Sequence, residues 1–276
     1  MIIYGRFLLD LIDSRNHIKS EISMPRFFVL GDSIDLAAGT IVIDGENAHH
    51  ITRSLRMAPG ERITVCDGVK NEYDCVFVHA DGEHVLCKIR NKTELSTEPP
   101  FEVSVFQALP KGDKLDTIIQ KSVECGASSI RTFESEFCVA REKSDTAQRK
   151  LERRSRIALE AAKQCGRGVV PKVLSTVDFK TAINEAALAD IPIFCYEGEG
   201  TLPLGKLISD KRKELGDTLC TPKISVVIGS EGGFSAEESK FAKENGMLMA
   251  GLGRRILRAE TVAGFVLACL VYEFEL

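Results

Sequence analysis

The sequence predicts an α/β protein in which a small β domain precedes a larger α/β domain. Short apolar strands separated by Asp-Gly turns fill residues 24–95, whereas strands alternate with longer helical segments over residues 96–276. Such alternation is typical of a parallel sheet that is covered by helices on both faces. The rhythm changes in a polar, Pro-containing stretch, residues 91–100, which has the composition of a linker.

Composition favours a cytoplasmic protein with reduced thiols. The chain has 276 residues, 44% of them hydrophobic, which is enough for one large core or two ordinary ones. Its nine cysteines form no Cys-x-x-Cys pair, so neither a disulfide framework nor a zinc site is expected. The net charge of -4 counts against a dedicated nucleic-acid binder unless local charge overturns it.

No membrane partner is expected. Residues 1–23 form an extension, either helical or disordered, in which Arg6, Asp10 and Asp13 interrupt the apolar residues, so it is a poor signal peptide. The most apolar segment, residues 262–272, is shorter than the roughly 20 residues that a membrane span needs.

The β domain is predicted from short runs of β-branched and aromatic residues. Strands are expected at residues 26–29, 41–43, 63–66, 73–79 and 85–89, and one short helix at residues 48–56. Short strands with Asp-Gly turns favour a small barrel. His49 and His50 are adjacent and therefore point apart on a helix, so no metal site is expected there.

The second domain is predicted to contain a parallel sheet with helices between its strands. Strands are expected at residues 103–106, 129–133, 191–196 and 224–228, and helices at 113–126, 145–166, 177–189 and 262–274. The first helix places Leu115, Ile118, Ile119, Ser122 and Val123 on one face. The second turns Leu151, Ala158, Leu159, Ala162 and Cys165 inward. Ligands of such sheets bind beyond the carboxyl ends of the strands.

Three of these strand ends carry glycines that predict a ligand site. They are Tyr196-Glu197-Gly198, Gly229-Ser230-Glu231-Gly232-Gly233 and Leu252-Gly253. Glycine lets backbone N–H groups approach an anion or an adenine closely, although the same residues also make simple tight turns. The glycine patterns of dinucleotide and nucleoside triphosphate sites are absent here. After the second loop, Ser235 and Glu238 predict a capping box that starts a helix.

Clustered cations suggest an anionic partner. Arg254, Arg255 and Arg258 precede the apolar C-terminal helix, where they either pair with Glu231 or Glu260 or face a phosphate backbone. Residues 141–167 concentrate further positive charge, which would attract RNA unless it is only a solvated face. Its basic members are Arg141, Lys143, Arg149, Lys150, Arg153, Arg154, Arg156, Lys163 and Arg167. Lys111, Lys114 and Lys121, and Arg26, Arg53 and Arg56 in the barrel, extend this set.

A series of motifs in chain order carries a family resemblance. The motifs are Met24-Pro25-Arg26-Phe27-Phe28 and the segments 49–56, 109–114, 120–126, 157–167, 228–235 and 252–261. Together they resemble the small-subunit ribosomal RNA uridine-N3 methyltransferases of the SPOUT superfamily, from residue 24 to the C-terminus. The two glycine motifs are specific in combination, whereas either one alone indicates only the superfamily.

The resemblance implies a PUA-like barrel followed by a methyltransferase domain with a C-terminal trefoil knot. It also implies a homodimer, S-adenosylmethionine as cofactor, no metal, and methylation of N3 of one uridine in 16S ribosomal RNA of the small subunit. The family pattern assigns the cofactor to Tyr196, Glu197, Gly198, Ile228, Gly229, Ser230, Glu231, Gly232, Leu252, Gly253, Ile256 and Leu257. This chain departs from the pattern at Phe137, Arg154, Ser230, Arg254 and Ala259, where the family usually has Arg, Trp, Pro, Pro and Thr.

Methyl transfer to a uracil suggests roles for the charged residues. The methyl group is already activated, so the protein must align an extruded base and deprotonate or polarise its N3–H. We expect Arg258 to stabilise charge on a uracil oxygen, with Glu260 or Glu124 orienting it. RNA contacts are expected from Arg26, Arg53, Arg56, Lys111, Lys121, Arg153 and Arg167. Two alternatives remain: a related methyltransferase that acts on ribose 2′-OH or on transfer RNA, and a non-catalytic RNA-binding module.

Overall fold

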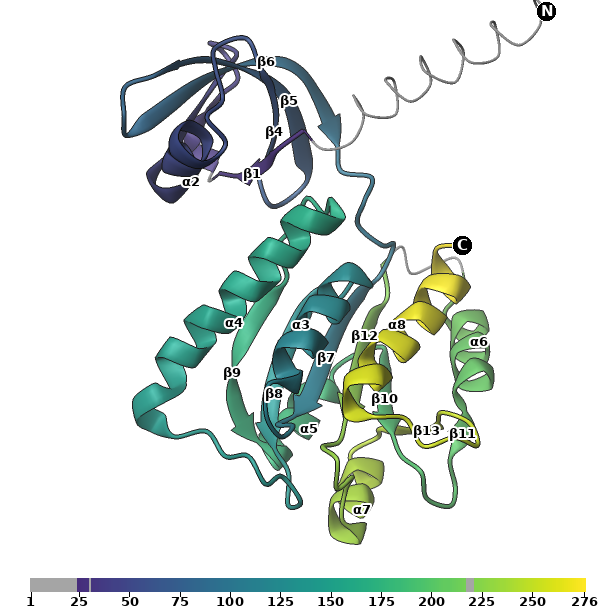
Figure 1. The fold of residues 1–276 in the computed structure, drawn as a ribbon. Coiled ribbons are helices and arrows are strands. Elements are labelled where there is room, and N and C mark those ends of the chain that lie inside the picture. Colours follow the sequence, from purple (N-terminus) through teal and green to yellow (C-terminus); the bar gives the residue numbers. More distant parts are fainter. Residues whose placement is uncertain (1–23, 30, 217–220) are drawn as a thin grey trace, which may run out of the picture. The chain divides into compact units, whose positions relative to one another are not determined.

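A computed structural model describes residues 24–29, 31–216 and 221–276 of the chain. The extension predicted for residues 1–23 lies outside the described residues. The chain divides between Ser96 and Thr97 into two compact units (Figure 1), and each is considered by itself below. None of the helices in the described ranges has both the length and the apolar character needed to cross a membrane.

The N-terminal unit is a six-stranded sheet that curves around an apolar core. Its strands run in the spatial order β1-β4-β5-β6-β3-β2, with β1 parallel to β4 and the other pairs antiparallel. The strands are β1 (Arg26–Phe28), β2 (Ile34–Asp35), β3 (Thr40–Asp44), β4 (Arg62–Cys66), β5 (Asn71–Ala80) and β6 (His84–Glu94). Alternate residues, such as Ile41 and Ile43 of β3, point into the core, as the period of two in a strand requires.

The helix of this unit begins earlier than predicted and changes type along its length. A short 3-10 turn, η1 (Gly31–Ser33), precedes it, and α2 (Gly45–His49) continues directly into a π-helical segment, η2 (His50–Ser54). Arg56 follows with a φ angle of 52°, in the left-handed region that non-glycine residues rarely adopt. This backbone reversal ends the helix.

The C-terminal unit contains a sheet of seven parallel strands, which confirms the predicted parallel sheet. The spatial order is β11-β13-β10-β12-β7-β8-β9. The strands are β7 (Glu102–Ala108), β8 (Ser129–Glu134), β9 (Lys172–Asp178), β10 (Ile191–Cys195), β11 (Leu202–Pro203), β12 (Lys223–Ile228) and β13 (Leu248–Gly251). The prediction missed β9, β11 and β13. Of the two outermost strands, β9 buries only one residue fully and both residues of β11 are exposed, so neither shows the apolar run of a buried strand.

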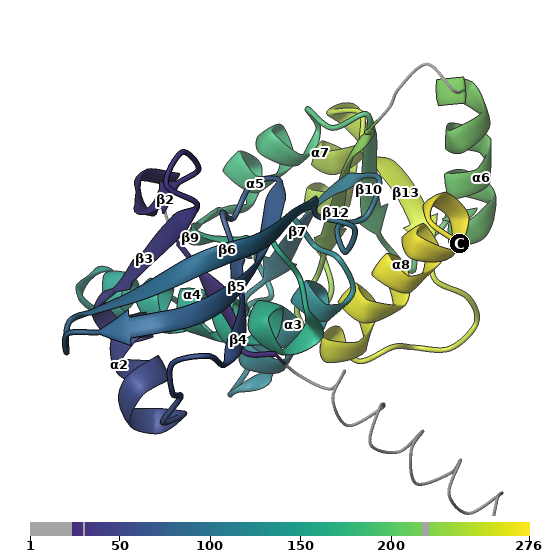
Figure 2. The ribbon, with the colours of Figure 1, turned by 90° about the horizontal axis from the view of Figure 1, so that it is seen from above.

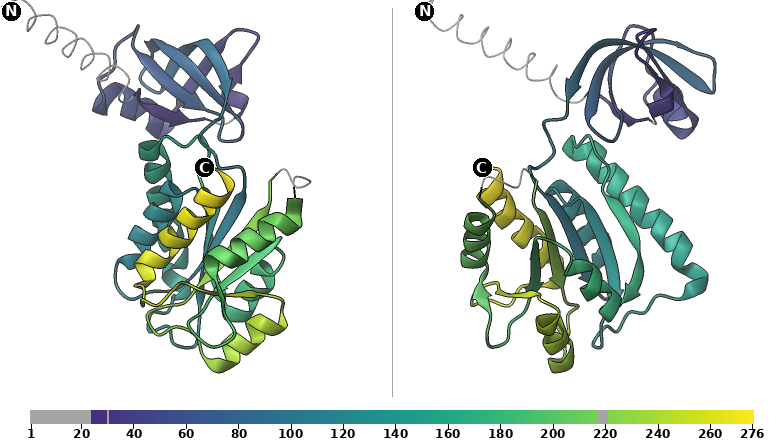
Figure 3. Two further views of the ribbon diagram at one scale, coloured as in Figure 1. Left: turned by 90° about the vertical axis from the view of Figure 1, so that its right-hand side faces the viewer. Right: turned by 180° about the vertical axis from the view of Figure 1, so that it is seen from behind.

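Helices cover both faces of this sheet. They are α3 (Lys114–Glu124), α4 (Ser144–Cys165), α5 (Phe179–Ala186), α6 (Leu204–Leu215), α7 (Ala236–Glu244) and α8 (Ala259–Phe274). Figure 2 shows α5 and α7 on the opposite side of the sheet from α3 and α8. In both views of Figure 3, α8 (yellow) lies beside α6 (green), and the two helices are in contact.

Two helix predictions are confirmed and one needs correction. Helix α3 buries the predicted face, and α7 begins with the predicted capping box of Ser235 and Glu238. In α4, however, Arg154 is buried and Cys165 is exposed. Arg154 can be buried because Glu142, itself buried, neutralises its guanidinium at 2.8 Å. Cys165 stands in the last turn, before Gly166 turns the chain away in the left-handed conformation.

Candidate active site

The three predicted glycine loops meet at a single cavity of about 590 Å³. They follow β10, β12 and β13, which are neighbours in the parallel sheet, so their carboxyl ends share one edge. Every predicted cofactor residue except Gly253 lines this cavity. These lining residues are Tyr196, Glu197, Gly198, Ile228, Gly229, Ser230, Glu231, Gly232, Leu252, Ile256 and Leu257.

The glycines of these loops are required by close packing as well as by turns. A Cβ atom at Gly198 would lie 2.0 Å from Cε1 of Tyr196, and one at Gly229 would lie 3.2 Å from the Cα of Gly233. A Cβ atom at Gly232 would lie 2.8 Å from the Cβ of Phe137. Side chains at these positions would therefore displace the walls of the cavity. Gly233 supplies the turn itself, with a φ angle of 68°.

The cavity loops are anchored to buried parts of the sheet. The N–H of Tyr196 donates a hydrogen bond to the carbonyl oxygen of Ala250, at 3.0 Å, which ties the loop after β10 to β13. Buried Gln107 of β7 donates from Nε2 to the carbonyl oxygen of Gly229, at 3.2 Å. The ring of Phe234 packs 4.3 Å from the ring of Phe194, measured between centroids. These contacts hold the loops in place before any ligand binds.

Lys114 lines the cavity. The sequence predicts it only as one of the cations, with Lys111 and Lys121, that extend the basic run of residues 141–167. Its Nζ lies 2.7 Å from Oε1 of Glu231 and 3.7 Å from Oε2 of Glu260. The backbone N–H of Lys111 also donates to Glu231, at 3.2 Å. The loop after β7 reaches the cavity because β7 pairs with β12, a neighbour relation that local sequence patterns do not reveal.

Both members of the Lys114–Glu231 pair are charged at neutral pH. The hydrogen bond to Glu231 raises the pKa of Lys114. Partial burial by itself would raise the pKa of Glu231, but the hydrogen bonds from Lys114 and from backbone N–H groups outweigh it, and the pKa is lowered. The cavity therefore carries a fixed cation between carboxylates.

Arg258 lines the cavity with an exposed guanidinium group, which makes one long ion pair. Its side chain is 81% exposed, and Nη1 lies 4.0 Å from Oε1 of Glu260. Glu260 stands in the first turn of α8, behind the cavity wall, and its Oε2 is buried without a hydrogen-bond partner among the described residues. Glu124, the other predicted orienting group, instead pairs with Lys121 at 2.7 Å, at the opposite end of α3 from Lys114.

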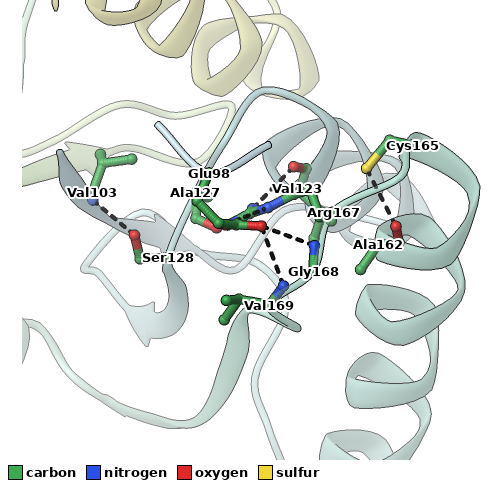
Figure 4. A network of polar contacts seen from close by, with 10 residues as sticks. All are labelled: Glu98, Val103, Val123, Ala127, Ser128, Ala162, Cys165, Arg167, Gly168 and Val169. Carbon is green, nitrogen blue, oxygen red and sulfur yellow. Dashed lines mark hydrogen bonds and ion pairs between the residues drawn. The ribbon is translucent and has the colours of Figure 1, made fainter. Parts of the chain in front are cut away.

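Two of the predicted RNA-binding arginines point into the protein. Arg167 is 5% exposed; it pairs with Glu98 at 2.6 Å and donates to the carbonyl oxygens of Val123 and Ala127 (Figure 4). Arg26 pairs with Glu72 at 2.6 Å and donates to Sγ of Cys66, with 15% of its side chain exposed. The structure thus gives Arg167 a structural role in place of the predicted RNA contact, because all of its donor groups lie near protein acceptors.

The other predicted RNA-binding residues have exposed side chains. Arg153 forms an ion pair with Asp116, and Lys121 pairs with Glu124, whereas Arg53, Arg56 and Lys111 form no ion pair within the described ranges.

The basic run of residues 141–167 likewise contains both ion-paired and unpaired cations. Ion pairs neutralise Arg141, Arg153, Arg154, Lys163 and Arg167. Lys143, Arg149, Lys150 and Arg156 remain exposed for an anionic partner.

Comparison with known proteins identifies the family. A family model described as an RNA methyltransferase domain matches residues 97–271, and one described as an RNA methyltransferase PUA domain matches residues 43–90. The chain is 33% identical to ribosomal RNA small subunit methyltransferase E of Bacillus subtilis (strain 168), over 87% of this chain and 92% of that protein. The chain belongs to the ribosomal RNA small subunit methyltransferase E family.

Solved structures of methyltransferase E proteins share this fold. The crystal structure of the Neisseria gonorrhoeae enzyme bound to S-adenosylmethionine superposes with a TM-score of 0.77 and 26% identity, over 91% of this chain and 98% of that one. A Legionella pneumophila methyltransferase with the same cofactor bound gives a TM-score of 0.76 and 25% identity, over the same shares of the two chains. The predicted family, the PUA-like N-terminal domain and the enzymatic class are thereby confirmed.

Metal ions in proteins are held by groups of His, Cys, Asp and Glu side chains. Across the part of the chain that the structure describes, no three His, Cys, Asp or Glu side chains are grouped as metal ligands. Burial raises the pKa of the Cys195 thiol at the cavity wall to about 12, so this cysteine is a poor nucleophile. Besides backbone amides, the polar groups that line the cavity include the cations Lys114 and Arg258, the carboxylates Glu197 and Glu231, and the hydroxyl of Ser230.

Proposed function

We propose that this protein transfers the methyl group of S-adenosylmethionine to N3 of one uridine in 16S ribosomal RNA, within the small subunit. The convergence of the three glycine loops on one cavity with cations at its mouth carries this proposal. A module that only binds RNA has no need of a backbone-lined cavity of about 590 Å³. The homologous small-subunit methyltransferases support ribosomal RNA as the substrate.

The residues of the cavity fit this cofactor. Gly198, Gly229 and Gly232 let the loops pack closely without side chains, so the backbone groups of these cavity-lining residues are available to a bound adenosine. Oγ of Ser230 is buried without a hydrogen-bond partner among the described residues, so a polar group is available to a ligand there. When bound, S-adenosylmethionine supplies a methyl group that its sulfonium sulfur already activates. The segments 196–198, 228–232 and 252–257 would hold it.

The protein's own cations supply the remaining chemistry. Removal of the proton from uracil N3 leaves negative charge spread over the neighbouring oxygens. The exposed guanidinium of Arg258 and the ammonium of Lys114 stabilise that charge, and Glu231 and Glu260 hold Lys114 in place. Exposed cations such as Arg53, Arg56 and Lys111 bind phosphates and position the RNA. We also propose a homodimer with the trefoil knot of the family.

Mass spectrometry of methylated nucleosides tests this function. Purified protein is incubated with S-adenosylmethionine and either small ribosomal subunits or free 16S ribosomal RNA, and the products are digested to nucleosides. The expected product is 3-methyluridine at one site, and comparison of the two substrates shows which of them is used. A 2′-O-methylated nucleoside, or methylation of transfer RNA alone, would replace this function by a related one. If calorimetric titration with S-adenosylmethionine gives no heat, the protein does not act as the proposed methyltransferase.

A further inference from the structure

An exposed aromatic ring stands beside the cavity and has no part in the chemistry above. Phe137 lies in the loop of residues 135–143, which follows β8, and the residue is 46% exposed. Its backbone packs directly on Gly232, a cavity residue, where an added Cβ atom would lie 3.3 Å from the carbonyl oxygen of Phe137. Phe137 therefore packs against one wall residue of the cavity proposed to hold the methyl donor.

One buried carboxylate ties the loop of Phe137 to the cavity loop. Glu238 is 8% exposed; its Oε1 accepts a hydrogen bond from the N–H of Glu136 at 2.8 Å, and its Oε2 accepts one from the N–H of Ser235 at 3.1 Å. On the other side, Nη2 of Arg141 donates to the carbonyl oxygen of Glu136, at 3.3 Å. Both backbone groups of the residue before Phe137 are thus held.

The far end of the loop is anchored as firmly. Oε1 of Glu142 lies 2.8 Å from Nη2 of buried Arg154 in α4, and the N–H of Glu142 donates to Glu134 at 2.7 Å. Polar contacts at both ends of the loop therefore hold the ring of Phe137 in place, although its own partial burial contributes little free energy. Exposed aromatic side chains on rigid supports are typical of recognition sites.

We propose that Phe137 is the surface on which a base of the RNA substrate stacks next to the methyl-donor cavity. A nucleobase fits this position because any base offers a flat π-face to an aromatic ring, and a base must leave its helix to be methylated. Lys143, exposed on the same loop and without an ion pair among the described residues, is placed to attract the phosphates of that strand. The inference rests on the proposed function, since it assumes an RNA substrate at this edge.

Three variants test this role. Phe137→Ala removes the ring, Phe137→Trp keeps an aromatic face, and Val139→Ala truncates a 69%-exposed apolar neighbour as a matched control. RNA affinity is measured by fluorescence anisotropy with a labelled small-subunit ribosomal RNA fragment, and cofactor affinity by calorimetry. Phe137→Ala should weaken RNA binding about 5- to 150-fold, the usual range for one stacked base, and leave cofactor binding unchanged. Phe137→Trp should retain most of the affinity, and Val139→Ala all of it.

Other results would overturn the stacking role. Equal RNA affinity in Phe137→Ala and the wild type would do so while leaving the proposed function intact, provided that the wild type still methylates RNA. A change of sedimentation coefficient in Phe137→Ala would make the ring part of an interface between copies of the chain. If the wild type shows no methyl transfer at all, the proposed function fails. The anisotropy measurement then still shows whether Phe137 contributes to RNA binding.

Discussion

The ammonium group of Lys114 lies 2.7 Å from the carboxylate of Glu231, a residue 117 positions later in the chain. This contact joins the first turn of α3 to the glycine loop after β12. It exists because β7 and β12 pair in parallel, so that both chain segments leave the sheet at the same edge. The topology of the sheet, and not the local sequence, thus places the Lys114 ammonium group at the cavity.

Replacing Lys114 by Met should lower kcat/KM for methyl transfer by roughly 100- to 1,000-fold, as removal of one stabilising donor does in other active sites. The substitution leaves Glu231 and Glu260 without their shared cation. Steady-state kinetics with the RNA substrate measures the effect. Lys211→Met is the control, because Lys211 forms a comparable pair with Glu214 on the surface of α6. Equal losses in both variants would contradict a specific role for Lys114.

Arg258→Ala should abolish methyl transfer and leave cofactor binding almost intact. The side chain is 81% exposed and makes only a loose contact with Glu260, so its removal should not disturb the fold. Single-turnover assays report the chemical step, and calorimetry reports cofactor affinity. Turnover at the wild-type rate would remove Arg258 from the mechanism.

Gly198→Ala should weaken cofactor binding at least tenfold, because the new methyl group would overlap the ring of Tyr196 and move it within the cavity. Calorimetric titration with S-adenosylmethionine measures the change. Gly205→Ala is the matched control, since no atom lies within 4 Å of its added Cβ and the residue is in α6. That variant should bind as well as the wild type and be as stable or slightly more stable. Unchanged affinity in Gly198→Ala would place the cofactor elsewhere.

Arg167→Ala should destabilise the C-terminal unit by about 3–5 kcal/mol, the usual cost of breaking a buried ion pair. The substitution removes the cationic partner of Glu98, which keeps only hydrogen bonds from the N–H groups of Gly168 and Val169, and it takes a donor from the carbonyl oxygens of Val123 and Ala127. Chemical denaturation measures the free energy of unfolding. Arg156→Ala, at an exposed position of α4, should change it by less than about 0.5 kcal/mol. A stable Arg167→Ala protein with reduced RNA affinity would restore the predicted RNA contact.

Asp67 should make the N-terminal unit sensitive to acid. Burial alone would raise the pKa of this carboxylate, but hydrogen bonds from Asn71, Lys70 and Val69 outweigh it and lower the pKa to about 2. Because the folded pKa is lower than the unfolded one, the stabilisation is complete above about pH 4 and is lost as the pH falls toward 2. Melting temperatures of the wild type and of Asp67→Asn should differ at pH 7 and converge near pH 2. A constant difference across this range would contradict the assignment.

The sequence by itself determined those features that depend on neighbouring residues. The 3.6-residue period indicated the buried face of α3, and the Ser235–Glu238 spacing indicated the capping box, because both follow from the geometry of a single helix. The glycine loops could be recognised because strand ends and glycines are local signals. Their assignment to a family relied on resemblance, as does the chemistry at uracil N3.

Only the tertiary structure decided which charged and aromatic side chains reach the cavity and which are buried. Lys114 lies at the cavity, and Phe137 packs against the cavity residue Gly232, because β7 and β8 follow β12 in the sheet, an order that strand patterns leave open. Arg154 and Arg167 are buried because Glu142 and Glu98 meet them from other parts of the chain, the latter 69 residues away. A charge enters a protein interior only where a partner neutralises it, and that partner is chosen by the fold.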